Sequence, residues 1–388
     1  MTRNNKLVLV SLLLWGIGEG LFVFIESLYL ERLGATPVEV GMTLALASAA
    51  VLVSYLPAGW LSDRFNRKAN MLAGYVVGAL AAFVMALAHD WHTLLLGLVF
   101  YAVSGFCVPA ITSYVVQEAA PRERNRVVTT VFVGYSAGLV ISPAIGGWLA
   151  EHWTMRGVFV VSGAAFLLAT ATVSLAAPQP RPPVAATMPA AWRALWGQPR
   201  VPRLAAVLMV FFIAAYMGFP LAPNFLARAG YDLAILGALG SVHAAGAVLW
   251  GVILGRLDER GTRGLLVGGA VLVLYAGLLV VVPPLPVIVM AFVLRGALIS
   301  VRSVAAARLA VEVDDQSLGL TFGLLSSLQA GGMMIAAWLA GLLFARNPAF
   351  PLLATIIFLP PILLLLWRDE RRAALARGPL APEPAESL

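Results

Sequence analysis

The chain has little charge and almost no cysteine. Only 12% of its 388 residues are Asp, Glu, Lys or Arg, whereas 61% are hydrophobic, and the mean hydropathy is +0.89. So few charges cannot cover the surface of an ordinary water-soluble protein of this length. The single cysteine, Cys107, excludes a disulfide within the chain and a thiolate metal cluster. The composition therefore predicts a protein whose surface lies largely in lipid.

Sequence patterns typical of ATPases and hydrolases are also missing. No phosphate-binding loop, nucleotide fingerprint, His-Glu-x-x-His or serine-elbow pattern stands where it could act. The four histidines, among them His243, do not have the spacing of a metal site. We therefore expect no enzyme and no resident cofactor or metal. The net charge of +7 does not indicate nucleic acid, because the placement of the basic residues fits a membrane topology instead.

Long apolar runs fill most of the chain. A continuous apolar run of about 20 residues predicts a membrane-spanning helix, whereas barrel strands alternate in polarity. The predicted fold is therefore an all-α membrane protein with twelve transmembrane helices. The runs lie at 7–30, 38–61, 69–88, 93–117, 127–150, 157–177, 203–227, 233–256, 264–282, 286–311, 318–344 and 350–367.

Basic residues are unevenly distributed between the predicted loops. If the N-terminus is cytoplasmic, the only basic residues in loops on the outer side of the membrane are Arg32, Arg156, Arg228 and Arg346. This positive-inside bias predicts that both termini are cytoplasmic, and the compact length and short loops favour a bacterial inner membrane. The domains expected are an N-terminal six-helix bundle at 1–177, a proline-rich cytoplasmic linker at 178–202, a C-terminal six-helix bundle at 203–370 and a cytoplasmic tail at 371–388.

The second half of the chain repeats the first. The segment 29–34 returns as 225–230, and at the same offset Gly41 matches Gly237, Gly59 matches Gly255 and Leu61 matches Leu257. Duplicated membrane bundles usually hold a solute site between their halves and expose it alternately to the two sides. The repeat therefore predicts a transporter.

A charged motif lies between the second and third predicted spans. It reads Gly59-Trp60-Leu61-Ser62-Asp63-Arg64-Phe65-Asn66-Arg67-Lys68. The motif resembles the cytoplasmic signature of the major facilitator superfamily, Gly-x-Leu-x-Asp-Arg-x-Gly-Arg-Arg/Lys, with Asn66 where glycine is usual. A shortened copy that includes Asp258 begins at Gly255 in the second half. The resemblance implies a fold of two pseudo-symmetric six-helix bundles, and a role for Asp63 in holding the cytoplasmic gate of the outward-open state.

Further gating residues are expected near this motif. Gly59 permits close helix packing, and Arg64 and Arg67 supply cations at the membrane edge. The loop after the fourth span, with Glu118 and Arg124, also resembles a family loop, and Glu312 stands in the matching place of the second half. The alternative is that the basic residues only set topology and that the loop charges are merely solvated.

The fifth predicted span resembles a motif that antiporters of this family carry. Its residues are Gly134, Gly138, Pro143, Gly146 and Gly147, with Ser142 in place of one glycine. The resemblance favours export, although small residues at these spacings also serve close helix packing alone. The fourth span lacks the arginine of proton-coupled drug exporters, since Gly97 or Tyr101 occupies that region.

Five ionisable residues fall deep inside predicted spans: Glu19, Glu26, His243, Arg295 and Arg302. Each costs about 2.5–3.5 kcal/mol on insertion scales, so such residues normally face a cavity or a partner. The glutamates are seven residues apart, as are the arginines, so each pair shares one helix face. In the family fold the first, fourth, seventh and tenth spans line the cavity, and we expect helices 1, 8 and 10 to meet around one site.

A protonatable carboxylate near a cation is the chemistry that we infer from these residues. Glu19, Glu26 and His243 are the candidates for proton coupling, and Arg295 would either hold Glu19 or bind an anionic group of the solute. The alternative is a permanent structural ion pair. Glu19, His243, Arg295 and further polar residues are candidates for binding substrate, although each of the latter could instead bond a neighbouring helix: Tyr55, Tyr101, Tyr135, Tyr216, Asn224, Arg302 and Gln329.

The function predicted from the sequence is proton-coupled export of a small amphipathic organic compound, as in the drug-antiporter branch that the chain resembles. The alternatives are a coupled or facilitative transporter of organic anions and, less favoured, a ligand sensor built on a transporter fold. The expected partners are a small-molecule solute, protons and the lipid bilayer, and a monomer is the family expectation.

Overall fold

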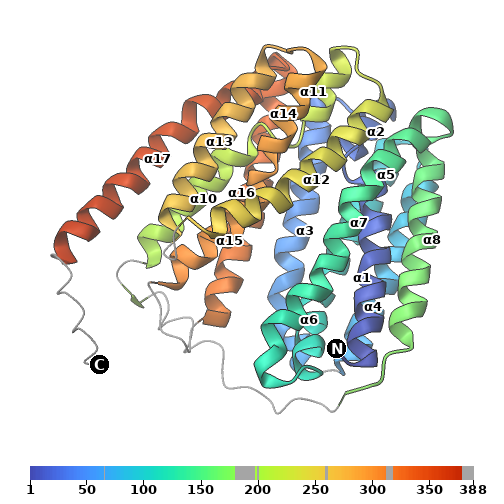
Figure 1. Cartoon of the computed structure of the whole chain (residues 1–388). Helices are drawn as coiled ribbons and strands as arrows, with labels where there is room; N and C mark the ends of the chain where they lie inside the picture. The colour runs from blue at the N-terminus through green and yellow to red at the C-terminus, as the bar shows by residue number, and fades with distance from the viewer. Residues whose placement is uncertain (65, 180–196, 199–200, 258–260, 312–317, 378–388) are drawn as a thin grey trace, which may run out of the picture.

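The structure is a computed structural model in which twelve apolar helical spans form one bundle (Figure 1). The backbone is described for residues 1–64, 66–179, 197–198, 201–257, 261–311 and 318–377. Side chains are described for these residues except 55–64, 121, 125, 310, 318–320, 322, 370 and 372–377. Eleven of the described helices are long and apolar enough to cross a membrane, and Val201–Tyr216 is a shorter apolar helix. The predicted all-α fold is confirmed.

The N-terminal half contains six spans. In order these are α1 (Arg3–Phe22) with α2 (Glu26–Arg32), α3 (Pro37–Arg64), α4 (Arg67–Ala86), α5 (Trp91–Ser104) with η1 (Gly105–Cys107) and α6 (Val108–Gln117), α7 (Arg124–His152) preceded by η2 (Pro121–Glu123), and α8 (Met155–Ser174).

The C-terminal half repeats this arrangement. Its spans are α10 (Val201–Tyr216) with α11 (Ala222–Arg228), α12 (Leu233–Gly255), α13 (Thr262–Val280), α14 (Leu285–Arg295) with α15 (Ala297–Ala310), α16 (Leu318–Arg346), and α17 (Phe350–Arg377).

The first, fourth, seventh and tenth spans are each broken into two helical segments. Pro220 and Pro223 predict a break in the seventh span between Tyr216 and Asn224, and the structure confirms it, because α10 ends at Tyr216 and α11 begins at Ala222 with Pro223 in its first turn. Proline lacks the N–H that would continue the helical hydrogen bonding. The fourth span tightens to a 3₁₀ turn before Pro109, and the tenth breaks at Gly296. Broken helices expose backbone polar groups, and transporters use such sites to line a cavity.

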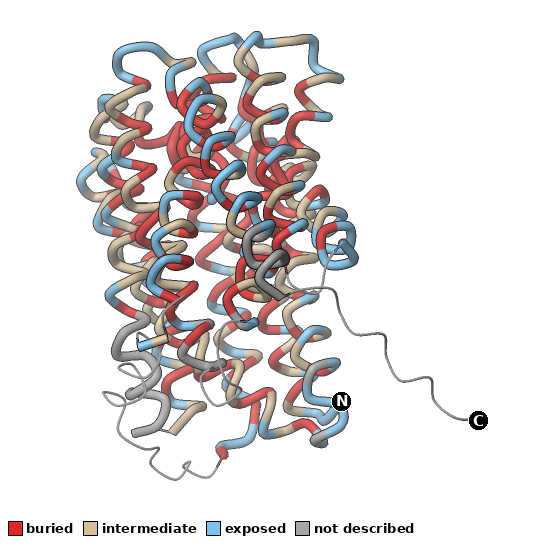
Figure 2. Tube along the Cα trace, turned by 90° about the vertical axis from the view of Figure 1, so that its left-hand side faces the viewer, coloured by how far each residue is buried: buried red, intermediate tan, exposed pale blue. Residues whose placement is uncertain are grey.

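The two ends of the bundle differ in how the halves meet. We call the end that carries Arg3 and the α6–α7 connection the terminal end, and the end that carries the α2–α3 and α11–α12 connections the distal end (Figure 1). At the distal end one apolar core takes side chains from both halves, such as Phe24 and Leu233. Toward the terminal end two separate cores follow, one in each half. Buried residues accordingly run along the bundle interior (Figure 2). Among the described side chains, the halves therefore share one core at the distal end and have separate cores toward the terminal end.

Two glycine contacts join the halves where α7 packs on α12 and α3 on α16. A Cβ atom placed on Gly237 would lie 2.6 Å from Cα of Gly147, and one placed on Gly41 would lie 2.7 Å from Cα of Gly341. Real side chains do not approach so closely, so both crossings need glycine. Since Gly41 and Gly237 are related by the sequence repeat, the crossings lie in equivalent places on the two sides of the bundle.

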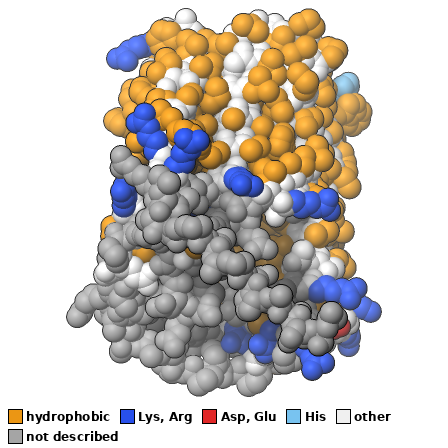
Figure 3. Space-filling view, turned by 60° about the vertical axis from the view of Figure 1, so that its left-hand side comes forward, with side chains coloured by type: hydrophobic (Ala, Val, Ile, Leu, Met, Phe, Trp, Pro, Cys, Tyr) orange, Lys and Arg blue, Asp and Glu red, His pale blue; other side chains and the backbone are white. Residues whose placement is uncertain are grey.

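The outer surface of the bundle is apolar. Large side chains such as Leu80, Leu168 and Ile357 are at least 59% exposed, which fits contact with lipid rather than water. Figure 3 shows this apolar band over one face, with Lys and Arg side chains gathering below it toward the terminal end. There α17 continues to Arg377, and Asp369 on it forms an ion pair with Arg203 of α10.

Candidate functional site

A cavity lies between the two halves and consists of two lobes. The first, of about 370 Å³, is lined by Glu19 and by five aromatic side chains, and we call it the aromatic lobe. The second, of about 250 Å³, is lined by Glu26 together with Ser48, Ser326 and Gln329, and we call it the polar lobe. The lobes share four lining residues, so they are adjoining parts of one cavity: Val51, Tyr101, Ala102 and Arg302.

The wall of the aromatic lobe is a packed group of rings. Trp15 stacks on Phe166 at 4.3 Å between ring centroids and on Tyr101 at 6.1 Å, and it meets Tyr75 at 4.7 Å. The aromatic rings that face the lobe are those of Trp15, Tyr75, Tyr101, Phe132 and Tyr135. Ring faces attract both apolar bodies and cations, so this wall suits an aromatic or cationic ligand.

Glu19 on α1 is held in place from α7. The hydroxyl of Tyr135 donates a hydrogen bond of 2.7 Å to Oε2 of Glu19, and Tyr101 is a second hydrogen-bonding neighbour of the same carboxyl. Both tyrosines were predicted to line a cavity, and the structure brings both into contact with Glu19. The carboxyl group is thus oriented by neutral donors while it faces the aromatic lobe.

Glu26 opens α2, directly after the break in the first span. Its side chain lines the polar lobe, and it makes no hydrogen bond or ion pair with the side chains that the structure describes. It lies close enough to Glu19 for their charges to interact. A carboxylate without a protein partner in a membrane-embedded cavity is available to a proton or a cationic ligand.

Arg302 faces these carboxylates from the opposite half. It lies on α15, is exposed, and lines both lobes, and its Nη2 donates a 3.1 Å hydrogen bond to Oγ of Ser326. Within the described part of the chain Arg302 is not ion-paired with either glutamate. The cavity therefore has two carboxyl groups on one wall and a guanidinium on the other, and no ion pair joins them within the described part of the chain.

Gln329 and Tyr216 lie beside the polar lobe in the C-terminal half. Nε2 of Gln329 donates a 2.7 Å hydrogen bond to the hydroxyl of Tyr216. Gln329 lines the lobe, whereas Tyr216 is buried behind it. The predicted candidate Asn224 lies elsewhere, because its Nδ2 donates to the carbonyl of Ser27 across the distal interface.

Arg295 does not pair with Glu19, which corrects the arrangement expected from the sequence. It is only 2% exposed, and its Nη2 donates a 3.0 Å hydrogen bond to the carbonyl of Phe219. Its guanidinium lies over the rings of Phe24, Phe219 and Phe292, at 4.8, 3.8 and 5.2 Å from their centroids. Depth along a helix does not specify the direction of a side chain, so equal depth did not bring these charges together.

His243 belongs to the same aromatic group as Arg295. Its ring centroid lies 5.5 Å from that of Phe219 and 6.3 Å from that of Phe24. The first, eighth and tenth spans therefore do meet, as expected, but they meet around Phe24 at the break of the first span. Neither His243 nor Arg295 lines the two lobes.

The predicted gating residues are only partly described. Five of them, Gly59, Asp63, Arg64, Asp258 and Glu312, lie outside the residues whose side chains the structure describes, and so does the predicted substrate-binding residue Tyr55. Arg67 and Glu118 both contact Gln179, through Nη1 at 3.4 Å and Oε1 at 3.3 Å. Arg124 is exposed at the start of α7. Gln179 thus links two gating candidates to the segment that follows α8.

The antiporter-like motif in α7 has two packing partners. Gly134, Gly138 and Gly146 contact α1, and Gly147 contacts Gly237 of the other half. Pro143 packs on Gly240, where a Cβ atom would lie 2.9 Å from the proline Cβ. The motif therefore seats α1 against α7 and closes the distal interface at the same time.

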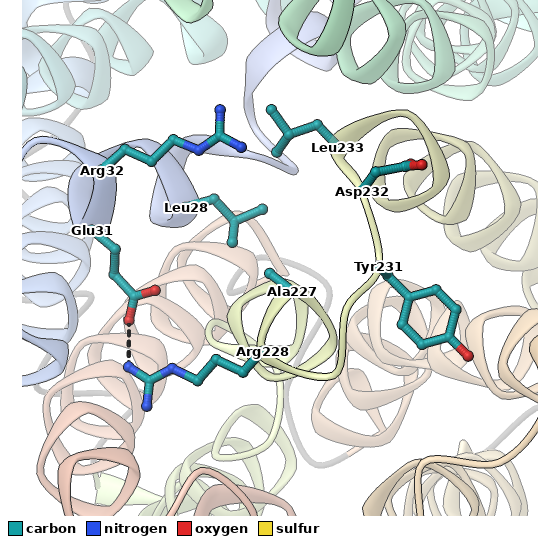
Figure 4. Close-up of a pocket in the computed structure, with 8 residues that line it drawn as sticks. All are labelled: Leu28, Glu31, Arg32, Ala227, Arg228, Tyr231, Asp232 and Leu233. Atoms are coloured by element: carbon teal, nitrogen blue, oxygen red, sulfur yellow. Dashed lines mark hydrogen bonds and ion pairs between the residues drawn. The ribbon is translucent and has the colours of Figure 1, made fainter.

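Sequence reasoning missed Trp15 and the distal ion pair between Glu31 and Arg228. Trp15 is four residues before Glu19 and eleven before Glu26, a spacing that places all three on one helix face, so this signal was available. The ion pair, at 3.1 Å, borders a distal pocket of about 340 Å³, and Figure 4 shows Glu31 and Arg228 reaching toward each other from opposite halves. No local pattern predicts such a contact across the repeat.

Comparison with known proteins places this geometry in a family. The model of the Major Facilitator Superfamily matches residues 7–313. The chain belongs to this superfamily. It is thus a transporter rather than an enzyme, and a multi-pass membrane protein that carries a small-molecule solute across a bilayer.

Its curated relatives are named for drug resistance or for sugar efflux. The multidrug resistance protein MdtH of Photorhabdus laumondii is 31% identical over 148 residues, which cover 36% of this chain and 37% of that protein. A sugar efflux transporter of Deinococcus radiodurans is 23% identical over 93% of this chain and 97% of its own length. The quinolone resistance protein NorA of Staphylococcus aureus is 24% identical over 44% of each chain. This chain thus covers less than half of the MdtH and NorA sequences.

Solved structures share the fold over nearly the whole chain. The nucleoside transporter NupG has a TM-score of 0.75 at 13% identity, covering 95% of this chain and 99% of that one. A bacterial homologue of the human lysosomal transporter Spinster, in an inward-facing and occupied conformation, has a TM-score of 0.74 at 16% identity, covering 95% and 96%. These likenesses confirm the predicted fold of two six-helix bundles.

Proposed function

We propose that this transporter is a proton-coupled antiporter that exports small amphipathic organic compounds. The observation that carries the proposal is the pair Glu19 and Glu26, two interacting carboxyl groups that face an aromatic-lined cavity without a cationic partner among the described side chains. A proton and a positively charged solute would compete for these groups. Such competition couples the movement of the solute to that of the proton in the opposite direction.

The direction proposed is from cytoplasm to outside, across a bacterial inner membrane with both termini cytoplasmic. The terminal end then faces the cytoplasm, and the conformation with parted terminal cores is the one that would load solute from inside. The name of the Deinococcus radiodurans relative, a sugar efflux transporter, supports export. The positive-inside distribution of the basic residues supports the orientation.

Transport would then require the distal contacts to separate. The halves would rock until the glycine crossings and the Glu31–Arg228 pair open and the terminal end closes. We assign the closing of the terminal end to Asp63, Arg64, Arg67, Glu118, Arg124, Asp258 and Glu312, on the basis of the family resemblance. We assign coupling to the two glutamates rather than to His243, because that ring lies among Phe24 and Phe219 outside both lobes.

A second candidate function is transport of small organic anions. Arg302 favours it, because an exposed guanidinium in a cavity suits a carboxylate or phosphate. Arg295 gives it no support, since its side chain is enclosed by aromatic rings away from the lobes.

Proton movement in proteoliposomes that contain a pH-sensitive dye tests the proposal. Lipophilic cations, neutral amphiphiles and organic anions are added in turn to wild type, Glu19→Gln and Glu26→Gln, with the exposed Glu123→Gln as the matched control. We expect cations or neutral amphiphiles to trigger proton flux that either cavity variant reduces and the control retains. Flux of solute without protons, unchanged by either variant, would disprove coupling. Loss of anion transport in Arg302→Gln would favour the second function.

A further inference from the structure

We infer that the preferred solute is a zwitterion: an aromatic body that carries both an ammonium and a carboxylate group. The inference rests on the proposed function only in taking the two lobes as the solute site. It is drawn from the two carboxyl groups that one half and the guanidinium that the other half present to one cavity.

The charges come from different halves and stay apart. Glu19 and Glu26 belong to the first span, whereas Arg302 belongs to the tenth. All three line the cavity, and in the described part of the chain no ion pair joins them. Charged groups in a membrane-embedded cavity are costly unless they find a partner. A ligand that offers both signs satisfies both walls at once.

Ligands with a single charge fit this cavity less well. A cation gains from the glutamates but brings its charge close to Arg302, and an anion gains from Arg302 but approaches two carboxylates. Like charges brought together in this way are a device for rejecting the wrong ligand. The order of affinity expected for one aromatic body is therefore zwitterion first, with the amine and the acid both weaker.

The aromatic lobe determines where the body of the ligand lies. Trp15 and Tyr101 form a stacked wall beside Glu19, and Tyr101 with Arg302 marks the passage into the polar lobe. A ring stacked on Trp15 therefore shares the lobe with the carboxyl group of Glu19 and the guanidinium of Arg302. A zwitterion bound in this way bridges the two halves.

The test uses three probes with the same ring system and different charges. They are 2-naphthylalanine as the zwitterion, 2-(2-naphthyl)ethylamine as the cation and 3-(2-naphthyl)propionic acid as the anion. Binding to the purified full-length chain is measured at pH 7 by titration calorimetry, without a membrane or a proton gradient. No proton flux is measured here, so failure of this test can be distinguished from failure of the antiport test above.

We expect the zwitterion to bind wild type about tenfold more tightly than either singly charged probe, as for a matched charge pair. In Arg302→Gln the zwitterion should no longer bind more tightly than the amine, and in Arg302→Lys part of this difference in affinity should return. In Glu26→Gln the advantage over the acid should shrink. The exposed Arg256→Gln, at the end of α12, should retain the wild-type order and serves as the control.

Two results would overturn the inference. If the amine binds wild type as tightly as the zwitterion and Arg302→Gln changes neither affinity, Arg302 takes no part in recognition. If none of the three probes binds, the cavity does not select an aromatic zwitterion. Proton flux with lipophilic cations would still support antiport in either case.

Discussion

Nη2 of Arg228 lies 3.1 Å from Oε1 of Glu31, and this ion pair joins the two halves at the distal end (Figure 4). Arg228 also lies over the ring of Phe344, 4.6 Å from its centroid. The two side chains are 45% and 21% exposed, so water weakens their attraction, and exposed pairs contribute about 1 kcal/mol or less. The pair therefore adjusts the balance between open and closed distal ends rather than fixing it.

Glu31→Gln should favour the open distal end. Loss of about 1 kcal/mol or less corresponds to at most about a fivefold shift in the equilibrium. The measurement is the rate at which a thiol reagent modifies Ser27→Cys, a buried distal position, in a Cys107→Ser background. Arg32→Gln, the neighbouring exposed arginine, is the matched control and should leave the rate unchanged. An equal rate in Glu31→Gln and wild type would show that the pair does not affect closure.

Gly147→Ala should prevent the distal end from closing fully. The new methyl group would lie 2.7 Å from Cα of Gly237, so α7 and α12 must separate, at a cost of about 1–3 kcal/mol for overpacking. We expect slower transport and faster modification of Ser27→Cys. Gly277→Ala is the control, because no atom lies within 4 Å of the added Cβ there. Normal transport by Gly147→Ala would contradict the close crossing.

Trp15→Ala should weaken the binding of aromatic solutes. Removal of one aromatic contact costs about 0.5–1.5 kcal/mol, or about two- to thirteenfold in affinity. Trp15→Phe keeps part of the wall and should lose less, which separates a binding defect from misfolding. Trp153→Phe, at an exposed position that is 59% accessible, is the control. The readout is the dissociation constant of a naphthyl solute, and an unchanged value in Trp15→Ala would exclude the aromatic lobe as its site.

Arg295→Met should fold and bind solute like wild type. Methionine keeps apolar contact with Phe24, Phe219 and Phe292, and it removes a charge that has no anionic partner among the described residues. Arg295→Lys should be less stable than Arg295→Met, because an ammonium group loses the planar stacking. Thermal unfolding and anion binding are the measurements. Loss of anion binding in Arg295→Met, with folding intact, would place Arg295 in the solute site.

Asp90, which lies outside the membrane-spanning helices, gives a prediction for how the stability of the fold depends on pH. Its carboxylate accepts hydrogen bonds from the backbone N–H and the hydroxyl of Thr93 at the start of α5, and the backbone bond chiefly holds the pKa of Asp90 below its usual range. A carboxyl group whose pKa is lower in the folded chain than in the unfolded chain stabilises the fold at pH values above its unfolded pKa. This stabilisation is lost as the pH falls through the folded pKa. Asp90→Ala should therefore lower the unfolding temperature at pH 7, and the difference should shrink toward pH 3. Asp90→Asn keeps the cap and should remain more stable than Asp90→Ala at pH 7.

The sequence predicted the membrane helices well, because apolar runs of spanning length have few other uses in a protein. It also identified Glu19, Glu26 and Arg302, which line the cavity, because charges inside a span are conspicuous. It did not predict which charges face one another. Arg295 and Arg302 share one helix face by spacing, but the break at Gly296 places them on different helices, α14 and α15. Arg295 therefore lies among aromatic rings, whereas Arg302 lines the cavity. Breaks of this kind depend on tertiary packing, which local spacing does not contain.

The ion pair between Arg203 and Asp369 binds the start of α10 to the last turns of α17. At about 1.5 Å per residue, a 28-residue helix is about 40 Å long, more than the hydrocarbon layer of about 30 Å. Its last turns, with Arg368 and Arg371, therefore reach the lipid headgroups, where each Arg adds about 1 kcal/mol of attraction to anionic lipid. The C-terminal half is thus anchored at a fixed depth in the leaflet. We therefore expect the N-terminal half to make the larger movement relative to the membrane, and anionic lipid content to influence the rate of the cycle.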